Sequence, residues 1–165
     1  MRTTIRFLLL APLISLVAAC GGGSDAEGAA ANQAAAEQAH TAYVNAINSN
    51  DLAQYNQTIT DDIVYLPPNS APLVGKAAVS AWVKDYFAAY HTVWVKTSLE
   101  FVVENDWAYE RYSYKSVDTP RADGPAAGTG VVTDTGNGIN IYHRGADGAW
   151  RVARDGWATD QAPAH

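Results

Sequence analysis

The chain has 165 residues, a net charge of −6 at pH 7, 48% hydrophobic residues and a single cysteine. This length suits one domain with a short tether rather than two domains. The scattered acidic charge argues against nucleic acid and anionic lipid as partners, and a lone cysteine excludes an internal disulfide.

The N-terminus has the pattern of an export signal. Arg2 and Arg6 precede an apolar run, residues 7–17, which is shorter than the roughly 20 residues that a membrane-spanning helix needs. Small residues then lead to Cys20. The pattern predicts a signal peptide over residues 1–19, and because both arginines leave with it, the mature chain has a net charge of about −8.

The tetrad Val17-Ala18-Ala19-Cys20 resembles the bacterial lipobox, whose cysteine receives a diacylglyceryl group and becomes the mature N-terminus. The resemblance implies lipidation of Cys20 and a lipid-anchored location in the bacterial cell envelope, with membrane contact through the anchor only. Gly21 implies, by similarity to Gram-negative lipoproteins, the periplasmic face of the outer membrane. Ordinary cleavage that leaves a free thiol is the alternative.

A linker and a first helix are expected after the signal peptide. Residues 20–33 are small and polar, which predicts a flexible linker. From Ala34 onward, apolar residues recur at spacings of three and four, which predicts a helix that ends in the turn at residues 48–51. The residues with this spacing are Ala35, Ala39, Ala42, Tyr43, Ala46 and Ile47.

Two more helices and a short strand are predicted next. The second helix spans Leu52 to Ile59, and a strand at residues 63–66 ends at Pro67-Pro68. The third helix follows Gly75 and has one apolar stripe. The stripe consists of Val79, Trp82, Val83, Tyr86, Phe87 and Tyr90.

From residue 93 the pattern becomes that of an antiparallel sheet. Apolar and polar residues alternate over residues 93–103, and a turn at Asn105-Asp106 leads into a strand from Trp107 to about Lys115. Residues 116–129 read as a loop. Further strands are predicted at residues 131–133, 138–144 and 150–157. Helices followed by antiparallel strands predict an α+β fold, with the domain over residues 34–160 and a tail over residues 161–165.

Several stretches of the chain resemble the nuclear transport factor 2-like superfamily, which includes SnoaL-like polyketide cyclases and ketosteroid isomerases. The resemblance lies in residues 42–52, Asp61-Asp62 and residues 75–79, and residues 138–157 are similar to an uncharacterised bacterial SnoaL-like branch. It implies a cone-shaped, cystatin-like α+β fold. In this fold N-terminal helices pack on a curved, mostly antiparallel sheet and enclose a mainly apolar pocket.

The ketosteroid isomerase site combines a general-base carboxylate, a hydrogen-bonding tyrosine and a protonated acid. By resemblance, the tyrosine falls on Tyr43 and the acid falls near Asn140, whose amide can also donate a hydrogen bond. The general base falls on Pro67, which cannot carry a proton. The isomerase mechanism is therefore not expected in its usual form.

Asp155 is the carboxylate that could replace the missing base. Counting by two along the last strand places Ala153, Asp155 and Trp157 on one face, and the family resemblance implies that this face lines the pocket. Burial among apolar neighbours would raise the pKa of Asp155 and suit it to proton transfer. The alternative is a structural role, in which Asp155 pairs with Arg111, Arg144 or a backbone donor.

The expected site therefore combines two catalytic candidates with a set of ligand-binding residues. Tyr43 and Asp155 are the catalytic candidates, although Tyr43 could equally be a core tyrosine packed on the sheet. The ligand-binding candidates are Tyr65, Trp82, Asn140, Tyr142 and Trp157. The histidines have no metal-binding spacing and Asp61-Asp62 more simply closes a helix, so neither a metal nor a cofactor is expected.

Three functions remain open at the level of the sequence. The first is a lipid-anchored protein that binds a small apolar or aromatic molecule, and the missing base at Pro67 favours it. The second is a cofactor-free isomerase, cyclase or hydratase of the SnoaL-like kind. The third is an envelope scaffold or assembly partner with a vestigial pocket. The many large aromatic residues in the strands also predict a homodimer through the exposed face of the sheet.

Overall fold

The computed structural model describes residues 22–161 and consists of three helices and a six-stranded sheet. The helices are α1 (Gly22–Ser49), α2 (Leu52–Gln57) and α3 (Lys76–Ala89). The strands are β1 (Ile59–Leu66), β2 (Leu73–Val74), β3 (Tyr90–Glu104), β4 (Trp107–Pro120), β5 (Val132–Arg144) and β6 (Trp150–Thr159). The α+β order predicted from the sequence is confirmed.

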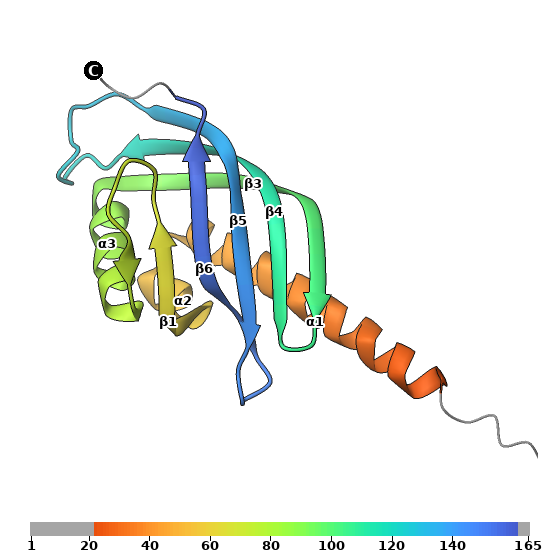
Figure 1. Cartoon of the computed structure of the whole chain (residues 1–165). Coiled ribbons are helices and arrows are strands. Elements are labelled where there is room, and N and C mark those ends of the chain that lie inside the picture. Colours follow the sequence, from red (N-terminus) through yellow and green to blue (C-terminus); the bar gives the residue numbers. More distant parts are fainter. Residues whose placement is uncertain (1–21, 162–165) are drawn as a thin grey trace, which may run out of the picture.

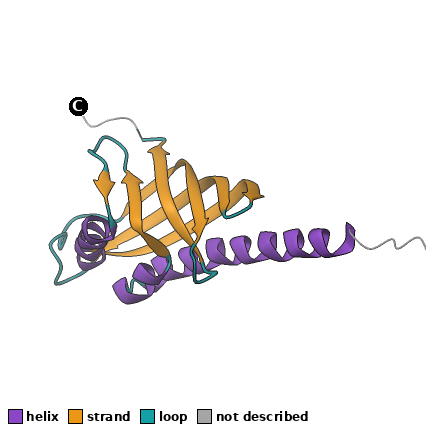
Figure 2. Cartoon of the chain, turned by 60° about the horizontal axis from the view of Figure 1, so that its bottom comes forward, coloured by secondary structure: helices purple, strands orange, loops and turns teal. Residues whose placement is uncertain are grey.

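The sheet has the strand order β2-β1-β6-β5-β4-β3. Neighbouring strands are antiparallel except β1 and β6, which are parallel, so the last strand of the chain lies in the middle of the sheet. The long strands β3, β4 and β5 curve strongly, and the helices lie against one face of the sheet (Figure 1; Figure 2). α1 packs on β3 and β6, and α3 packs on β1, which leaves a buried apolar core between the layers.

α1 begins at Gly22, inside the segment predicted to be a flexible linker. This part of the chain is rich in alanine, the residue with the highest helix propensity, which offsets its lack of apolar bulk. Residues 26–31 are exposed and extend past the sheet (Figure 2). Asn32 anchors the helix, because its Nδ2 donates a hydrogen bond to the carbonyl of Asn105 in the β3–β4 turn at 2.7 Å. No helix within residues 22–161 is long and apolar enough to cross a membrane.

Two strands are longer than the sequence pattern predicts. β4 continues to Pro120 because residues 116–120 pair with the start of β3. β3 itself begins at Tyr90, which was expected on the third helix, and not at residue 93. β5 is one strand over residues 132–144 rather than two, and it pairs with β4 from Val132 to His143. These segments resemble loops in composition because polar side chains of β4 and β5 face a cavity instead of an apolar core.

Smaller differences occur around β1. α2 ends at Gln57 and β1 already begins at Ile59, so Asp61 and Asp62 lie within the strand rather than before it. β2 is a two-residue strand in the segment expected to be a loop, and it pairs with β1. A β-bulge between Ser98 and Glu100 interrupts the alternation of β3.

Candidate functional site

A cavity of about 480 Å³ lies between the concave face of the sheet and the three helices. Its wall is mainly aromatic. The aromatic lining residues are Tyr43, Tyr55, Tyr65, Trp82, Tyr86, Phe87, Trp94, Tyr112, Tyr114 and Trp157. The polar lining includes the carboxyl groups of Asp118, Asp134 and Asp155. A concave, mostly apolar site with a few polar groups is the usual form of a small-molecule pocket.

Asp155 is the most deeply buried carboxyl group of this cavity, with an exposed fraction of 3%. The hydroxyl of Tyr43 donates to its Oδ2 at 2.7 Å, and the hydroxyl of Tyr112 donates to its Oδ1 at 3.0 Å. Burial raises the pKa of Asp155, although the charge of Lys96 and these hydrogen bonds act in the opposite direction. The result is a buried acid held by neutral donors and not by an arginine or lysine salt bridge.

Three tyrosine hydroxyls continue from Asp155 as a chain. Tyr65 forms hydrogen bonds with both Tyr43 and Tyr55, and all three side chains are buried. Burial raises the pKa of each of these phenols, and the nearby carboxyl group of Asp155 adds to the rise. The three groups therefore remain protonated at neutral pH. Because Tyr43 donates to Asp155, Tyr65 donates to Tyr43 and Tyr55 to Tyr65, so a ligand oxygen receives a phenolic hydrogen bond only by displacing one of these contacts.

The indole of Trp82 joins α3 to the sheet side of the cavity. It stacks on Tyr86 with a centroid distance of 5.4 Å and an interplanar angle of 7°. It also meets Trp157 edge to face, and Trp157 in turn meets Tyr65 in the same way. Aromatic pairs in these geometries stabilise one another beyond their burial, so they hold the wall in a defined shape.

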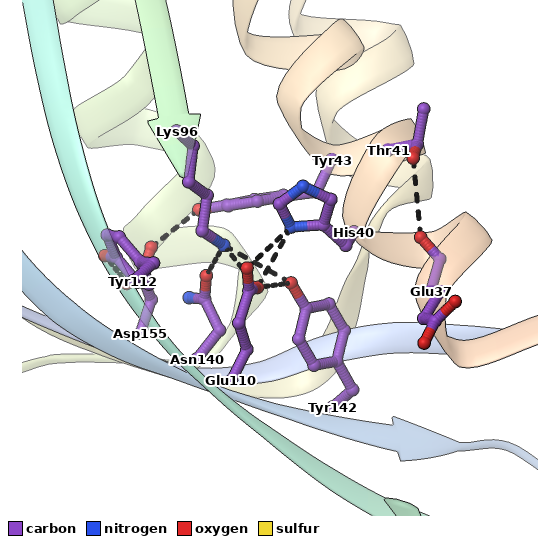
Figure 3. A network of polar contacts seen from close by, with 10 residues as sticks. All are labelled: Glu37, His40, Thr41, Tyr43, Lys96, Glu110, Tyr112, Asn140, Tyr142 and Asp155. Atoms are coloured by element: carbon purple, nitrogen blue, oxygen red, sulfur yellow. Dashed lines mark hydrogen bonds and ion pairs between the residues drawn. The ribbon is translucent and has the colours of Figure 1, made fainter. Parts of the chain in front are cut away.

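A second polar cluster lies beside Asp155 (Figure 3). The side chains of Lys96 and Glu110 are fully buried, and Lys96 Nζ lies 2.7 Å from Glu110 Oε2. Lys96 also donates to Asn140 Oδ1, Tyr142 donates to Glu110 at 2.7 Å, and His40 Nδ1 lies 2.9 Å from Glu110 Oε1. Burial raises the pKa of Glu110, but His40, Lys96 and Tyr142 outweigh this effect and hold it at about 2.

The structure places five of the expected site residues around the cavity. They are Tyr43, Tyr65, Trp82, Asp155 and Trp157. Asn140 and Tyr142 do not line the cavity, and in this respect the structure differs from the expectation. Asn140 does pair with Asp155 across β5 and β6, but its amide oxygen and the Tyr142 hydroxyl are engaged by the Lys96–Glu110 pair. Cys20 lies outside the described residues.

The proposed ion pairs of Asp155 are absent from residues 22–161. Arg111 interacts with Glu100 and Arg144 with Asp106, all at exposed or half-exposed positions. Tyr55, Tyr112 and the Lys96–Glu110 pair were not expected from the sequence. Tyr112 and Tyr114 alternate along the predicted strand, which is a signal for a shared face, but only the pairing with β5 shows that this face lines the cavity.

The chain matches the SnoaL-like domain family over residues 40–154, which is more than half of its length. It therefore belongs to this family, whose fold is that of the nuclear transport factor 2-like and ketosteroid isomerase-like superfamily. No curated protein matches the chain significantly.

Solved structures support the same fold. A ketosteroid isomerase-like protein from Erwinia carotovora atroseptica superposes with a TM-score of 0.68 at 25% identity, covering 79% of this chain and 98% of that one. A conserved protein from Planctomyces limnophilus gives 0.69 at 25% identity with the same shares, 79% and 98%. A proposed dehydratase of the NTF2-like family from Streptomyces avermitilis gives 0.67 at 16% identity, covering 81% and 99%, and this similarity shows the fold alone.

Proposed function

We propose that the cavity binds a small apolar or aromatic molecule and that Asp155 exchanges a proton with it, as in a cofactor-free isomerase, cyclase or hydratase. The observation that supports this proposal is a carboxyl group that lines an open cavity, is buried, and accepts a tyrosine hydrogen bond at each oxygen without an ion-pair partner among the described residues. A structural carboxylate at this depth would normally be paired with a cation. A raised pKa brings an acid closer to the range in which it can both accept and release protons.

The tyrosines around Asp155 supply the other half of this chemistry. Tyr43 contacts Asp155 directly and continues into Tyr65 and Tyr55, and all three phenols stay protonated. A carbonyl or hydroxyl oxygen of a ligand that displaces one of these hydrogen bonds would be polarised by the freed phenol while Asp155 takes or returns a proton. Pro67 lines the cavity but has no proton to exchange, and Asp155 is the most deeply buried of the carboxyl groups that line it.

Binding without a reaction is the second candidate, and one observation favours it. Both oxygens of Asp155 already accept a phenolic hydrogen bond, so proton exchange requires one tyrosine to give way to the ligand. The aromatic wall by itself is sufficient for binding. The third possibility, a scaffold with a vestigial pocket, is disfavoured because the cavity is open.

Native mass spectrometry and proton exchange together test the proposal. Small molecules retained on the purified protein are identified and then incubated in deuterated water with the wild type, Asp155→Asn, or the surface control Asp85→Asn. We expect the wild type and the control to catalyse exchange or rearrangement, and Asp155→Asn to lose about 100-fold or more of this rate while still binding. A retained compound that the wild type leaves unchanged would establish binding alone.

We also propose that the protein is anchored in the bacterial cell envelope through a diacylglyceryl group on Cys20. The support is the sequence of the first 20 residues and nothing in the folded domain. Intact-mass measurement of membrane-extracted protein should give a chain that begins at Cys20 and carries acyl groups. A Cys20→Ala variant that stays in the membrane fraction with the same mass pattern would contradict the anchor.

A further inference from the structure

The cavity contains three carboxyl groups, and each is hydrogen-bonded by neutral hydroxyls. Tyr86 donates to Asp118 at 2.5 Å, and Ser116 donates to the other oxygen at 3.3 Å. Tyr114 donates to Asp134 at 2.7 Å, and Thr159 donates to the same carboxyl group. Asp155 accepts from Tyr43 and Tyr112. Hydroxyls orient these acids without neutralising them.

Basic side chains are missing from the wall. Within residues 22–161, no lysine, arginine or histidine lines the cavity, and none of its three acids has an ion-pair partner within 4.0 Å. Lys96 is close, because its Nζ lies 4.2 Å from the centre of the Tyr112 ring, but it is matched by Glu110 and does not line the cavity. The cavity therefore has a net negative field.

Two of the acids lie together, away from Asp155. Asp134 is the cross-strand partner of Ser116, and Asp118 is two residues further along β4 on the same face of the sheet. Asp134 accepts a hydrogen bond from Thr159, which lies four residues after Asp155 in β6. Four residues of a strand span about 13 Å, so Asp134 lies well away from Asp155. The two acids can therefore hold one end of a ligand while another part of it reaches Asp155.

The aromatic wall has the same preference for positive charge. The faces of indole and phenol rings are electron-rich and attract cations, above all ammonium groups that are shielded from water. Trp82 and Tyr86 form a stacked pair in the wall, and Tyr86 is also the donor to Asp118. Carboxylates and aromatic faces thus lie side by side.

We infer that the ligand of this cavity carries an organic ammonium group, held by Asp118 and Asp134 against the aromatic wall, with its remaining part directed toward Asp155. This inference rests on the proposed function, because it assumes that the cavity binds a small molecule. A carboxylate or sulfonate ligand would instead meet three acids and no cation, and like charges at such distances repel.

Three phenols of nearly equal shape and different charge test the inference by calorimetric titration of the purified protein. They are (4-hydroxyphenyl)trimethylammonium, its uncharged analogue 4-tert-butylphenol, and 4-hydroxybenzenesulfonate. We expect the cation to bind about tenfold or more tightly than 4-tert-butylphenol, and the sulfonate to bind most weakly. Equal or tighter binding of the uncharged phenol to the wild type would overturn the inference without any variant.

Variants of the cavity acids then test which carboxyl groups bind the cation. Asp118→Asn and Asp134→Asn should each weaken binding of the cation about fivefold and leave binding of 4-tert-butylphenol within about twofold. Asp85→Asn, which removes the same charge from the exposed face of α3, should change neither. If the affinity for the cation falls equally in all three variants, the cation responds to the overall charge of the protein, and the site at Asp118 and Asp134 is wrong.

The same titrations separate this inference from the proposed function. If 4-tert-butylphenol binds and the cation does not, the cavity still takes aromatic molecules and only the preference for ammonium is wrong. If none of the three phenols binds at millimolar concentration, both the preference and the use of the cavity for small aromatic molecules are wrong.

Discussion

The carboxyl group of Asp155 accepts one phenolic hydrogen bond at each oxygen, from Tyr112 and from Tyr43. Because burial outweighs these contacts, its pKa lies above the ordinary value of 3.8. The folded protein then keeps a proton on Asp155 at pH values where the unfolded chain has released it. By linkage, this residue makes the folded state less stable as the pH rises from about 4 through the pKa of the folded state.

Replacing Asp155 should remove this pH dependence. We expect the stability of Asp155→Asn, relative to the wild type, to increase as the pH rises above about 4 and to level off above the pKa of the folded state. At the acidic end of the series, below the ordinary pKa of 3.8, the two proteins should differ by about 1 kcal/mol or less, because an amide has nearly the shape of a protonated carboxyl group. Urea unfolding at several pH values measures the difference. A variant that becomes relatively less stable with rising pH would instead indicate an ion-paired Asp155.

At the scale of residues, sequence periodicity could place Tyr43, Trp82 and Asp155 on faces that meet, because a helix stripe and a strand alternation each define a face. It could not find the Lys96–Glu110 pair. The two residues belong to different strands, and charged side chains in alternating strands usually face solvent. Their burial becomes visible only from the register of β3 and β4 and from the packing of α1 over this part of the sheet.

At the scale of elements, two glycines of β5 make room for the tyrosines of β4. Gly138 is the cross-strand partner of Tyr112, and Gly136 is the partner of Tyr114. A Cβ atom on Gly138 would lie 2.3 Å from the Tyr112 hydroxyl oxygen and 2.8 Å from the carbonyl oxygen of Gly156. The ring of Tyr112 therefore lies across β5 and reaches Asp155 because a side chain is missing there.

Adding that side chain should harm both the strand and the site. We expect Gly138→Ala to destabilise the protein by about 2 kcal/mol and to move Tyr112 away from Asp155. The control is Gly130→Ala, where an added methyl group meets open space and should lower the free energy of unfolding far less. Urea midpoints of the two variants measure the effect. Equal stability of the two variants would show that the sheet adapts to the methyl group.

The sequence predicted the elements themselves better than their lengths. Apolar alternation located the body of each long strand, but β4 and β5 extend into segments where Ser116, Asp118 and Asp134 face the cavity. The alternation over residues 93–103 also looks like one continuous face. The bulge after Ser98 divides it, so Val95 points outward whereas Phe101 packs against the core.

At the scale of the whole molecule, the face of the sheet opposite the helices is unusually apolar. Exposed apolar residues come from three neighbouring strands. They are Val93, Val95, Leu99 and Val102 of β3, Trp107 and Tyr109 of β4, and Ile139 of β5. The exposed Arg111–Glu100 pair and Lys115 lie among them. Exposed apolar surface of this kind commonly marks an interface. A second copy of the chain, related by a two-fold axis, is the partner that we propose for it.

Light scattering tests this homodimer. The protein at tens of micromolar should have about twice the mass of one chain, and the double variant Val95→Lys/Ile139→Lys should be monomeric, because it places charges at the centre of the face. Val131→Lys adds a charge at an exposed residue outside the strands and should remain dimeric. A wild-type protein that is monomeric under these conditions would exclude the dimer.

The central position of β6 also determines when the fold can form. β1 has only the two-residue β2 as a neighbour until β6 pairs with it, and β5 is likewise left with one open edge. β6 follows all of its partner strands in the sequence, so it leaves the ribosome after them, and pairing between residues far apart in the sequence is slow. The sheet and the Asp155 pocket are therefore completed only after residues 150–159 have been made. A domain that stays unfolded until its last strand is synthesised can still be threaded across a membrane, which suits the export predicted by its N-terminal sequence.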